Sequence, residues 1–455
     1  MTTRPPERFS QRHRILSPDL ARGLALLGIA LANVATAWLP SDTSYQAHRL
    51  GGMVSGSIGE QVAVVISAMF IHVRGLPMFS AMLGYGVGMI VTSLWRRQYP
   101  EGRARGILAR RYGFLALFGL LHMVFLFWGD IMFFYGVAGM IFAAMMTLRD
   151  KSLWWFAGVL FAVYAIGTVL ISVAVPMMMG DGAASEFTAV TQSPESYGGY
   201  LLFALLMVVG QVVAIPVEIL MLMPVMIIGF IAARHRVLSR VDEFRRQLWA
   251  AVWVMLAVVV LVGLPWGLAE IGVLPTSWAP MFSGLNQAFG VLTGPGIVAA
   301  VALLAQPLQR RLNEQAAQGE STQGKTTQGE AIRLPLLPRM VAALGARSMS
   351  GYVFQSFLLL IITQPFTLGL GIGQGILGAS AVAAGVWLIT MFLAFALELA
   401  GRRGPFEAVH RRISYGKNGL QDPYVDPQSS SYADIPGARP LGSNIYDNDG
   451  DPDRR

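Results

Sequence analysis

The chain has 455 residues, of which 54% are hydrophobic and only 13% are charged. A typical soluble protein carries roughly 25% charged residues, so a soluble domain of this size could not cover its surface, and a chain that is disordered throughout is also excluded. The absence of cysteine excludes disulfides, thiolate metal sites and cysteine nucleophiles. The net charge of +8 is explained by basic cytoplasmic loops, so we predict neither a nucleic-acid partner nor a metal site.

Long apolar runs predict an all-α fold, a polytopic transmembrane helical bundle. A first apolar run at about 20–39 follows the basic N-terminus. Because no signal-peptide cleavage site is evident, we expect this run to be a transmembrane helix that starts in the cytoplasm. The run at about 58–95 is too long for one simple crossing, and a break is expected at Val73-Arg74-Gly75. Eight more spans are predicted at about 112–128, 131–148, 153–175, 217–233, 248–268, 285–308, 341–366 and 376–400.

The distribution of arginine sets the predicted orientation. The loop 96–111 holds six arginines against one acid, Glu101, and is expected in the cytoplasm. Segment 177–200 has acids but no lysine or arginine and is expected outside. The apolar run 201–233 is expected to make one crossing, preceded by a tilted or interfacial helix, with kinks at Pro216 and Pro224. About ten crossings then leave both termini in the cytoplasm.

The composition divides the chain into five parts. We expect a cytoplasmic N-terminal segment (1–16), transmembrane helices one to eight (17–308), a polar flexible linker that repeats a TQG unit (309–340), helices nine and ten (341–400) and a cytoplasmic tail (401–455). The tail is rich in Pro, Ser and Asp and is expected to be largely disordered after about residue 420.

Ionisable residues within spans are costly in lipid and usually face an interior cavity. Asp19 and Arg22 share a helix face, although an N-terminal acid beside a snorkelling arginine is the simpler interpretation. Glu218 either lines a cavity or caps a broken helix. Asp130 is either a turn residue after Gly129 or a group that orients a histidine.

His122 is the most informative of these residues. It lies eleven residues after Arg111, about 16 Å along a helix, and therefore about half-way across the bilayer. A neutral histidine could simply hydrogen-bond a backbone carbonyl, but its pKa range also suits proton transfer near neutrality. Asp130 follows eight residues later, about 12 Å further along one helix, so a direct contact would require the chain to bend and is not assumed.

Five ordered segments resemble the YeiB-like family of bacterial polytopic membrane proteins. They are SPDLARGLALLGIALANV (17–34), FSAMLGYGVGM (79–89), GLLHMVFLFWGDIMFFYGVAG (119–139), LGARSMSGYVFQS (344–356) and GPFEAVHRRISYG (404–416). The chain departs from the family pattern at Ser350 and Gly351, where Thr and Asn are usual, and at Ser414, where Thr is usual. The resemblance runs from about residue 15 to 417, without the linker and the tail.

This family of unknown function is similar to transmembrane acyltransferases, including the lysosomal enzyme that acetylates heparan glucosamine. The resemblance places Asp19, Arg22 and Asn33 in the opening motif of that enzyme. Its catalytic histidine lies in the luminal loop soon after, which makes His48 a rival to His122 as the base. The spacing from Arg111 to His122 also resembles an Arg/Lys-x10-His pattern in another branch of these acyltransferases.

The resemblance implies a membrane-bound O- or N-acyltransferase of the bacterial plasma membrane. It would move an acetyl or other acyl group from cytoplasmic acyl-CoA to an envelope sugar or glycolipid, with His122 as general base. No permanently bound cofactor is expected, and a homo-oligomer is left open. The predicted catalytic residues are His122, Asp130, Asp19 and Arg22; the substrate-binding residues are Asn33, Ser80, Tyr135, Glu218, Tyr352 and Gln355; and the residues that bind acyl-CoA are Arg96, Arg97, Arg110, Arg111 and Arg347.

Other functions stay open at this point. A transporter or exporter of a small polar or lipid-linked molecule could use His122, Asp130 and Glu218 as a proton path. A scaffold for envelope assembly would need none of these residues for chemistry. The arginines of 96–111 are most simply a topology signal, and they could also bind anionic lipid headgroups.

Overall fold

The computed structural model describes residues 15–39, 42, 44–186, 194–321, 334–417 and 419–424, without the side chains of 173–186 and 315–321. Within these residues it contains α-helices and no strand. The helices are α1 (Leu16–Asn33), α2 (Ile58–Ile66), α3 (Gly75–Arg96), α4 (Glu101–Phe125), α5 (Met132–Met145), α6 (Asp150–Glu186), α7 (Tyr197–Arg234), α8 (Arg245–Val258), α9 (Leu264–Glu270), α10 (Ala279–Gly290), α11 (Thr293–Ser321), α12 (Leu336–Ala346), α13 (Ser348–Thr363), α14 (Gly375–Leu399) and α15 (Pro405–Tyr415).

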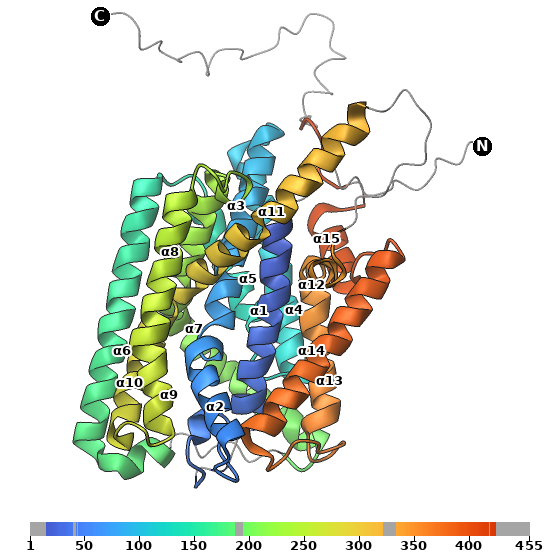
Figure 1. Ribbon diagram of the computed structural model, residues 1–455. Coiled ribbons are helices and arrows are strands. Elements are labelled where there is room, and N and C mark those ends of the chain that lie inside the picture. Colours follow the sequence, from blue (N-terminus) through green and yellow to red (C-terminus); the bar gives the residue numbers. More distant parts are fainter. Residues whose placement is uncertain are drawn as a thin grey trace, which may run out of the picture.

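The helices form a bundle in which α1 runs through the middle (Figure 1). Helices α6, α8, α9 and α10 lie on one side of α1, and α12, α13 and α14 lie on the other (Figure 1). One continuous apolar core joins α1, α3, α4, α5, α7 and α12. Because these central helices come from distant parts of the chain, the bundle is a single packed unit.

Basic residues gather at one end of the bundle, which we call the basic end. The turn between α3 and α4, the turn between α7 and α8, and helix α15 lie there. Among the described residues of the connections at the opposite end, the lysines and arginines are only Arg49 and Arg74. This polarity agrees with the predicted orientation, in which the basic end is cytoplasmic.

Seven helical segments among the described residues are long and apolar enough to cross a membrane, or eight when the bent pair α10–α11 is counted as one span. The chain is therefore a multi-pass helical membrane protein, as predicted. The remaining two predicted spans correspond to the shorter apolar helix α5 and to the short helices α12 and α13. The number of about ten crossings stays a prediction.

The predicted break in the second span is confirmed. Helix α2 continues as a π-helical turn over Ser67–Ile71, and α3 begins only at Gly75. The buried Arg74 holds this break, because its guanidinium donates to the carbonyl of Met69 over 2.9 Å and to Oδ1 of Asn286 over 2.7 Å. Carbonyl groups that a broken helix leaves without intrahelical partners are thereby satisfied.

Helix ends differ from the prediction at four places. The arginine-rich segment 96–111 is mostly helical, because α4 already begins at Glu101, where Glu101 and Arg105 pair across one turn at 2.6 Å. The run 201–233 is one helix, α7, that contains both Pro216 and Pro224; neighbouring groups in a bundle can satisfy the carbonyls that prolines release. Helix α6 extends to Glu186 and α11 to Ser321, so part of the expected external loop and part of the expected linker are helical.

The predicted ninth span is two helices rather than one. Helix α12 ends at Ala346, and α13 starts at Ser348 after Arg347, whose backbone is not helical. Several predictions fall outside the described residues. They are the N-terminal segment up to residue 14, the TQG part of the linker at 322–333 and the tail after residue 424.

Candidate functional site

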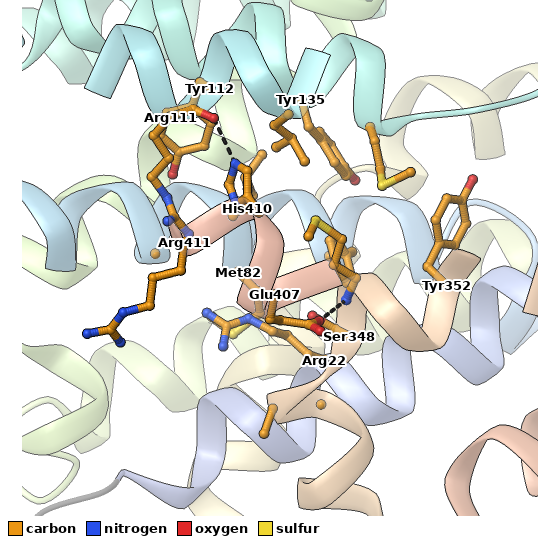
Figure 2. A pocket seen from close by; sticks show the side chains of 18 of the residues that line it. Arg22, Met82, Arg111, Tyr112, Tyr135, Ser348, Tyr352, Glu407, His410 and Arg411 are labelled. Carbon is orange, nitrogen blue, oxygen red and sulfur yellow. Dashed lines mark hydrogen bonds between the residues drawn. The ribbon is translucent and has the colours of Figure 1, made fainter. Parts of the chain in front are cut away.

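A cavity of about 460 Å³ lies between α1, α3, α4, α5, α13 and α15 at the basic end. This volume is in the range of small-molecule binding sites. Its outer part is lined by Arg22, Arg111, Arg403 and Arg411, which we call the arginine mouth. Its inner part is lined mainly by apolar and aromatic side chains from α1, α3, α4, α5 and α13. Figure 2 shows Arg111 and Arg411 at one end of the cavity and Tyr352 at the other.

The arginine mouth is positively charged. Arg22 lies 3.4 Å from Asp19 on the same helix, and the Arg111 guanidinium lies 5.3 Å from the ring centre of Tyr415. Arg403 and Arg411 are exposed. Among the described lining residues, four arginines stand against one carboxylate, Glu407. Such a cluster attracts anions, and arginine is well suited to bind phosphate oxygens.

Glu407 is already engaged by the N-terminus of α13. Its carboxylate accepts hydrogen bonds from the backbone amides of Met349 at 2.8 Å and Ser350 at 3.0 Å, and also from the Ser350 hydroxyl. A carboxylate at this place satisfies amides that have no intrahelical partner. Gly404 leaves the room for this contact, because a Cβ there would overlap the Glu407 carboxylate. The motifs 344–356 and 404–416 are thus in contact. Ser350 supplies the hydroxyl that Thr, the usual residue of the family pattern at this position, would supply.

His410 attaches the other side of α15 to α4. Its Nε2 donates to the backbone carbonyl of Arg111 over 2.8 Å, and the side chain is buried (Figure 2). Burial, followed by the nearby Arg111 charge, lowers the pKa of His410 to about 4. The imidazole is therefore neutral at pH 7 and serves as a hydrogen-bond donor in the cavity wall.

Two tyrosines define the inner end of the cavity. The Tyr135 hydroxyl hydrogen-bonds the Ser80 hydroxyl at 3.0 Å, and both residues are buried. The Tyr352 ring centre lies 5.0 Å from that of His122. The Tyr352 hydroxyl is buried and has no hydrogen-bond partner among the described residues. The end of an apolar cavity therefore carries hydroxyl groups that could face a ligand.

His122 and Asp130 form a buried pair behind Tyr352. The Nδ1 of His122 lies 2.7 Å from Oδ2 of Asp130, and both side chains are almost fully inaccessible. The chain bends as this contact requires, because α4 ends at Phe125 and α5 returns from Met132. The Oδ1 of Asp130 also accepts from the Phe133 amide over 2.8 Å, so Asp130 is both a turn residue and the partner of the histidine.

Tyr352 also lines a second, much smaller void. It measures about 10 Å³ and is lined by Asn33, Tyr352, Gln355 and other residues of α1 and α13. This is close to the space that one water molecule needs. The buried Gln355 also donates to the Thr390 hydroxyl over 3.2 Å. Tyr352 therefore lines both spaces, and the predicted substrate-binding residues Tyr135, Asn33 and Gln355 also line one or the other.

The structure does not bring every predicted acyl-CoA ligand to the cavity. Arg97 donates to the Leu420 carbonyl over 3.2 Å and anchors the segment after α15. Arg110 donates to the Ser414 carbonyl. Arg347 donates to the Arg402 carbonyl over 2.7 Å, and Arg96 is exposed outside the cavity lining. Of the predicted set only Arg111 lines the cavity. The guanidinium groups of Arg97, Arg110 and Arg347 instead bind backbone carbonyls.

Two further candidates do not line the cavity. Glu218 on α7 accepts from the Gln211 amide nitrogen over 2.6 Å and is not among the described lining residues. His48 lies in a short 3-10 helix (His48–Leu50) in the connection at the opposite end of the bundle. The geometry therefore favours His122 over His48 as the histidine near the cavity.

The contribution of α15 to the cavity was not predicted from the sequence. Helix α15 and the residues next to it supply Arg403, Glu407, His410, Arg411 and Tyr415 to the lining. The signal was present in the segment GPFEAVHRRISYG (404–416), which resembles a family motif. Its place after the last span suggested a cytoplasmic tail, and nothing in the sequence indicates that it folds back onto α4 and α13.

Comparison with known proteins agrees with the resemblance. Residues 329–417 match the family described as "Protein of unknown function (DUF418)". DUF418 is the YeiB-like family that the sequence motifs predicted, and the matched residues include α12, α13, α14 and α15. Two walls of the cavity therefore come from the DUF418 segment.

A curated relative is similar over a shorter share of its length. The "Uncharacterized protein YxaH" of Bacillus subtilis (strain 168) is 28% identical over 174 residues. The match covers 38% of this chain and 42% of the relative, so the chain spans less than half of the length of that protein. No solved structure matches the chain. These matches carry no activity, so the activity must be argued from the site.

Proposed function

We propose that this protein is a membrane acyltransferase that uses acyl-CoA as donor and an envelope sugar or glycolipid as acceptor. The observation that carries the proposal is the buried His122–Asp130 pair, at 2.7 Å, next to a cavity that runs inward from the arginine mouth. A histidine oriented by a carboxylate is a recurrent general base. The proposal makes the protein a bacterial plasma-membrane enzyme with its donor site at the cytoplasmic face.

The arginine mouth suits the donor. The phosphates of CoA would bind Arg22, Arg111, Arg403 and Arg411. Of these four, only Arg111 was predicted from the sequence as an acyl-CoA ligand. The apolar inner part would take the acyl arm. This arrangement brings the thioester toward Tyr135 and Tyr352 at the inner end of the cavity.

The chemistry follows from the inner end. The acceptor hydroxyl or amine attacks the thioester carbonyl, the new C–O or C–N bond forms, and the C–S bond to CoA breaks. His122 takes the proton from the acceptor and returns it to the CoA thiolate, while Asp130 stabilises the imidazolium. Tyr352 packs against His122 and must shift to let the acceptor reach it. Its hydroxyl is a candidate donor to the oxyanion of the tetrahedral intermediate.

The first prediction concerns His122. Replacing His122 by Gln, which keeps a hydrogen-bonding side chain of similar size, is expected to lower acyl transfer by about 10²- to 10⁴-fold. The measurement is CoA release by purified, reconstituted protein with membrane extract as acceptor. His48→Gln, at the opposite end of the bundle, is the matched control and should keep full turnover. Unchanged turnover in His122→Gln would remove this residue from the mechanism.

Proton-coupled transport is the second candidate function. The specific observation that favours it is that Tyr352 lines two interior spaces and packs against a buried His–Asp pair. A transporter would use such a pair to couple a proton to substrate passage. Substrate movement into vesicles that depends on a proton gradient, without any CoA dependence, would favour transport over acyl transfer.

A further inference from the structure

Helix α15 is amphipathic, and part of its apolar surface is not covered by the rest of the bundle. Its buried face carries His410 and Ser414. Three apolar residues, Phe406, Val409 and Ile413, lie next to this face and remain 36%, 48% and 37% exposed. Their spacing of three and four residues places them on one stripe of the helix. An isolated apolar stripe facing water would be unfavourable.

Exposed basic side chains lie on the rest of α15 and next to its ends. Arg402, Arg403, Arg411, Arg412 and Lys417 are exposed within or next to α15. The one carboxylate of the helix, Glu407, is engaged by the N-terminus of α13. A short helix with a strong apolar stripe, a basic polar face and low average hydrophobicity is typical of helices that lie in the membrane interface.

The stripe also continues a face of the bundle that is exposed and apolar. Leu117, Leu121 and Phe125 of α4 are exposed at a spacing of four residues, which is the pattern of a lipid-facing stripe. Arg110 lies two helical turns before Leu117 and therefore on the same face of α4, and its guanidinium donates to the Ser414 carbonyl of α15. Helix α15 is thus attached to the lipid-facing side of α4 at its basic end.

We propose that α15 lies in the headgroup layer of an anionic membrane leaflet. Phe406, Val409 and Ile413 would reach the upper acyl chains, and the arginines with Lys417 would contact anionic headgroups. Since Arg403, Glu407, His410 and Arg411 also line the cavity, the arginine mouth then opens at the level of the headgroups. The proposal holds whether the protein transfers acyl groups or transports a substrate.

The test uses the full chain, which contains no cysteine. Val409→Cys and Ala408→Cys each carry an environment-sensitive fluorophore, and each protein is reconstituted into vesicles of phosphatidylcholine alone or mixed with phosphatidylglycerol. Ala408 is exposed on the other side of α15 from the apolar stripe, so it is the matched control. Quenchers attached to the acyl chains are expected to quench the label at position 409 severalfold more than at 408, and iodide in the buffer the reverse.

Phosphatidylglycerol is expected to strengthen the acyl-chain quenching at position 409, and high salt to reverse that gain. Arg402→Gln with Arg412→Gln should abolish the phosphatidylglycerol-dependent part while the label stays attached to folded protein. Equal quenching by iodide at 408 and 409 would overturn the proposal. So would a label at 409 that is shielded from both quenchers, which would indicate a protein partner or a second copy. Quenching that is independent of phosphatidylglycerol and salt would overturn the anionic headgroup assignment.

Discussion

Buried hydrogen-bonding groups hold α15 against the cavity. Glu407 binds the first turn of α13, and His410 binds the carbonyl of Arg111. Removing one partner of a buried hydrogen bond costs about 1–3 kcal/mol, because the other partner is left without compensation. These two contacts lie on different neighbours of α15, so each is expected to contribute to keeping the helix in place.

The second prediction follows from the lowered pKa of His410. The folded protein holds His410 with a pKa of about 4, against an ordinary value of 6.5. Between these values the unfolded chain binds more protons than the folded protein, so the free energy of unfolding falls as the pH falls, by up to about 3 kcal/mol. Thermal unfolding of the detergent-solubilised protein, measured from pH 7 to pH 4, should show this loss.

His410→Gln is the matched variant for this prediction. Its side-chain amide can still donate to the Arg111 carbonyl, but it does not titrate. The variant is therefore expected to lose less stability than the parent protein between pH 6.5 and about pH 4. Identical pH profiles for the two proteins would contradict the role given to His410.

Helix packing in the bundle depends on close approach at small residues. At the crossing of α1 and α12, a Cβ on Gly345 would overlap the Asp19 carbonyl, and one on Gly23 would overlap the Val341 carbonyl. Small residues let helices in membranes approach closely enough for such backbone contact. This crossing positions both Arg22 and the start of α13, and so shapes the cavity.

The third prediction concerns this crossing. Gly345→Ala is expected to destabilise the protein by about 1–3 kcal/mol, because the added methyl group forces α1 and α12 apart. Gly385→Ala on α14 is the control, since its new Cβ would meet nothing within 4 Å, and it should be neutral or slightly stabilising. Unfolding midpoints of both variants in detergent check this. An unchanged midpoint in Gly345→Ala would show that the crossing tolerates separation.

Basic residues are distributed unevenly along the long axis of the molecule. Arginines gather at the end that contains the cavity mouth, and the opposite end carries few basic residues among those described. Such an asymmetry orients membrane proteins, because basic segments remain in the cytoplasm. The cavity and α15 are therefore expected to face the cytoplasm.

The fourth prediction tests the orientation and the number of crossings. Single cysteines are placed in the cysteine-free chain at Leu337 in the first turn of α12, Leu368 after α13 and Ser277 before α10. A membrane-impermeant maleimide on intact cells should label Leu368→Cys and Ser277→Cys, whereas Leu337→Cys should react only after permeabilisation. A Leu368→Cys protein that labels only in permeabilised cells would mean that the α12–α13 pair does not cross the membrane.

Much of the architecture could be predicted because it depends on local composition. Apolar length located the helices, and the cost of a basic residue in lipid located the break at Arg74. Helix ends were harder to predict. The prolines at 216 and 224 do not end α7, since the surrounding bundle can satisfy the released carbonyls. Conversely α12 ends before Arg347, where the side chain binds carbonyls of the chain after α14.

The candidate site was predictable only in part. His122 and Asp130 could be selected because ionisable groups in a span are rare, but their contact depends on the turn between α4 and α5. The arginines looked equivalent because charge in a sequence does not reveal hydrogen-bond partners. Arg97 and Arg347 bind backbone carbonyls, whereas Arg22 lines the cavity.

The sequence by itself determined the class and the approximate position of most apolar helices, and it predicted the orientation, because the free energy of placing apolar or basic residues in lipid depends on each segment alone. Only the tertiary structure decided the site. The cavity needs contacts between residues far apart in the chain, such as Glu407 with Ser350 and His410 with Arg111. Those contacts depend on how α15 folds back onto α4 and α13, and no single segment contains that information.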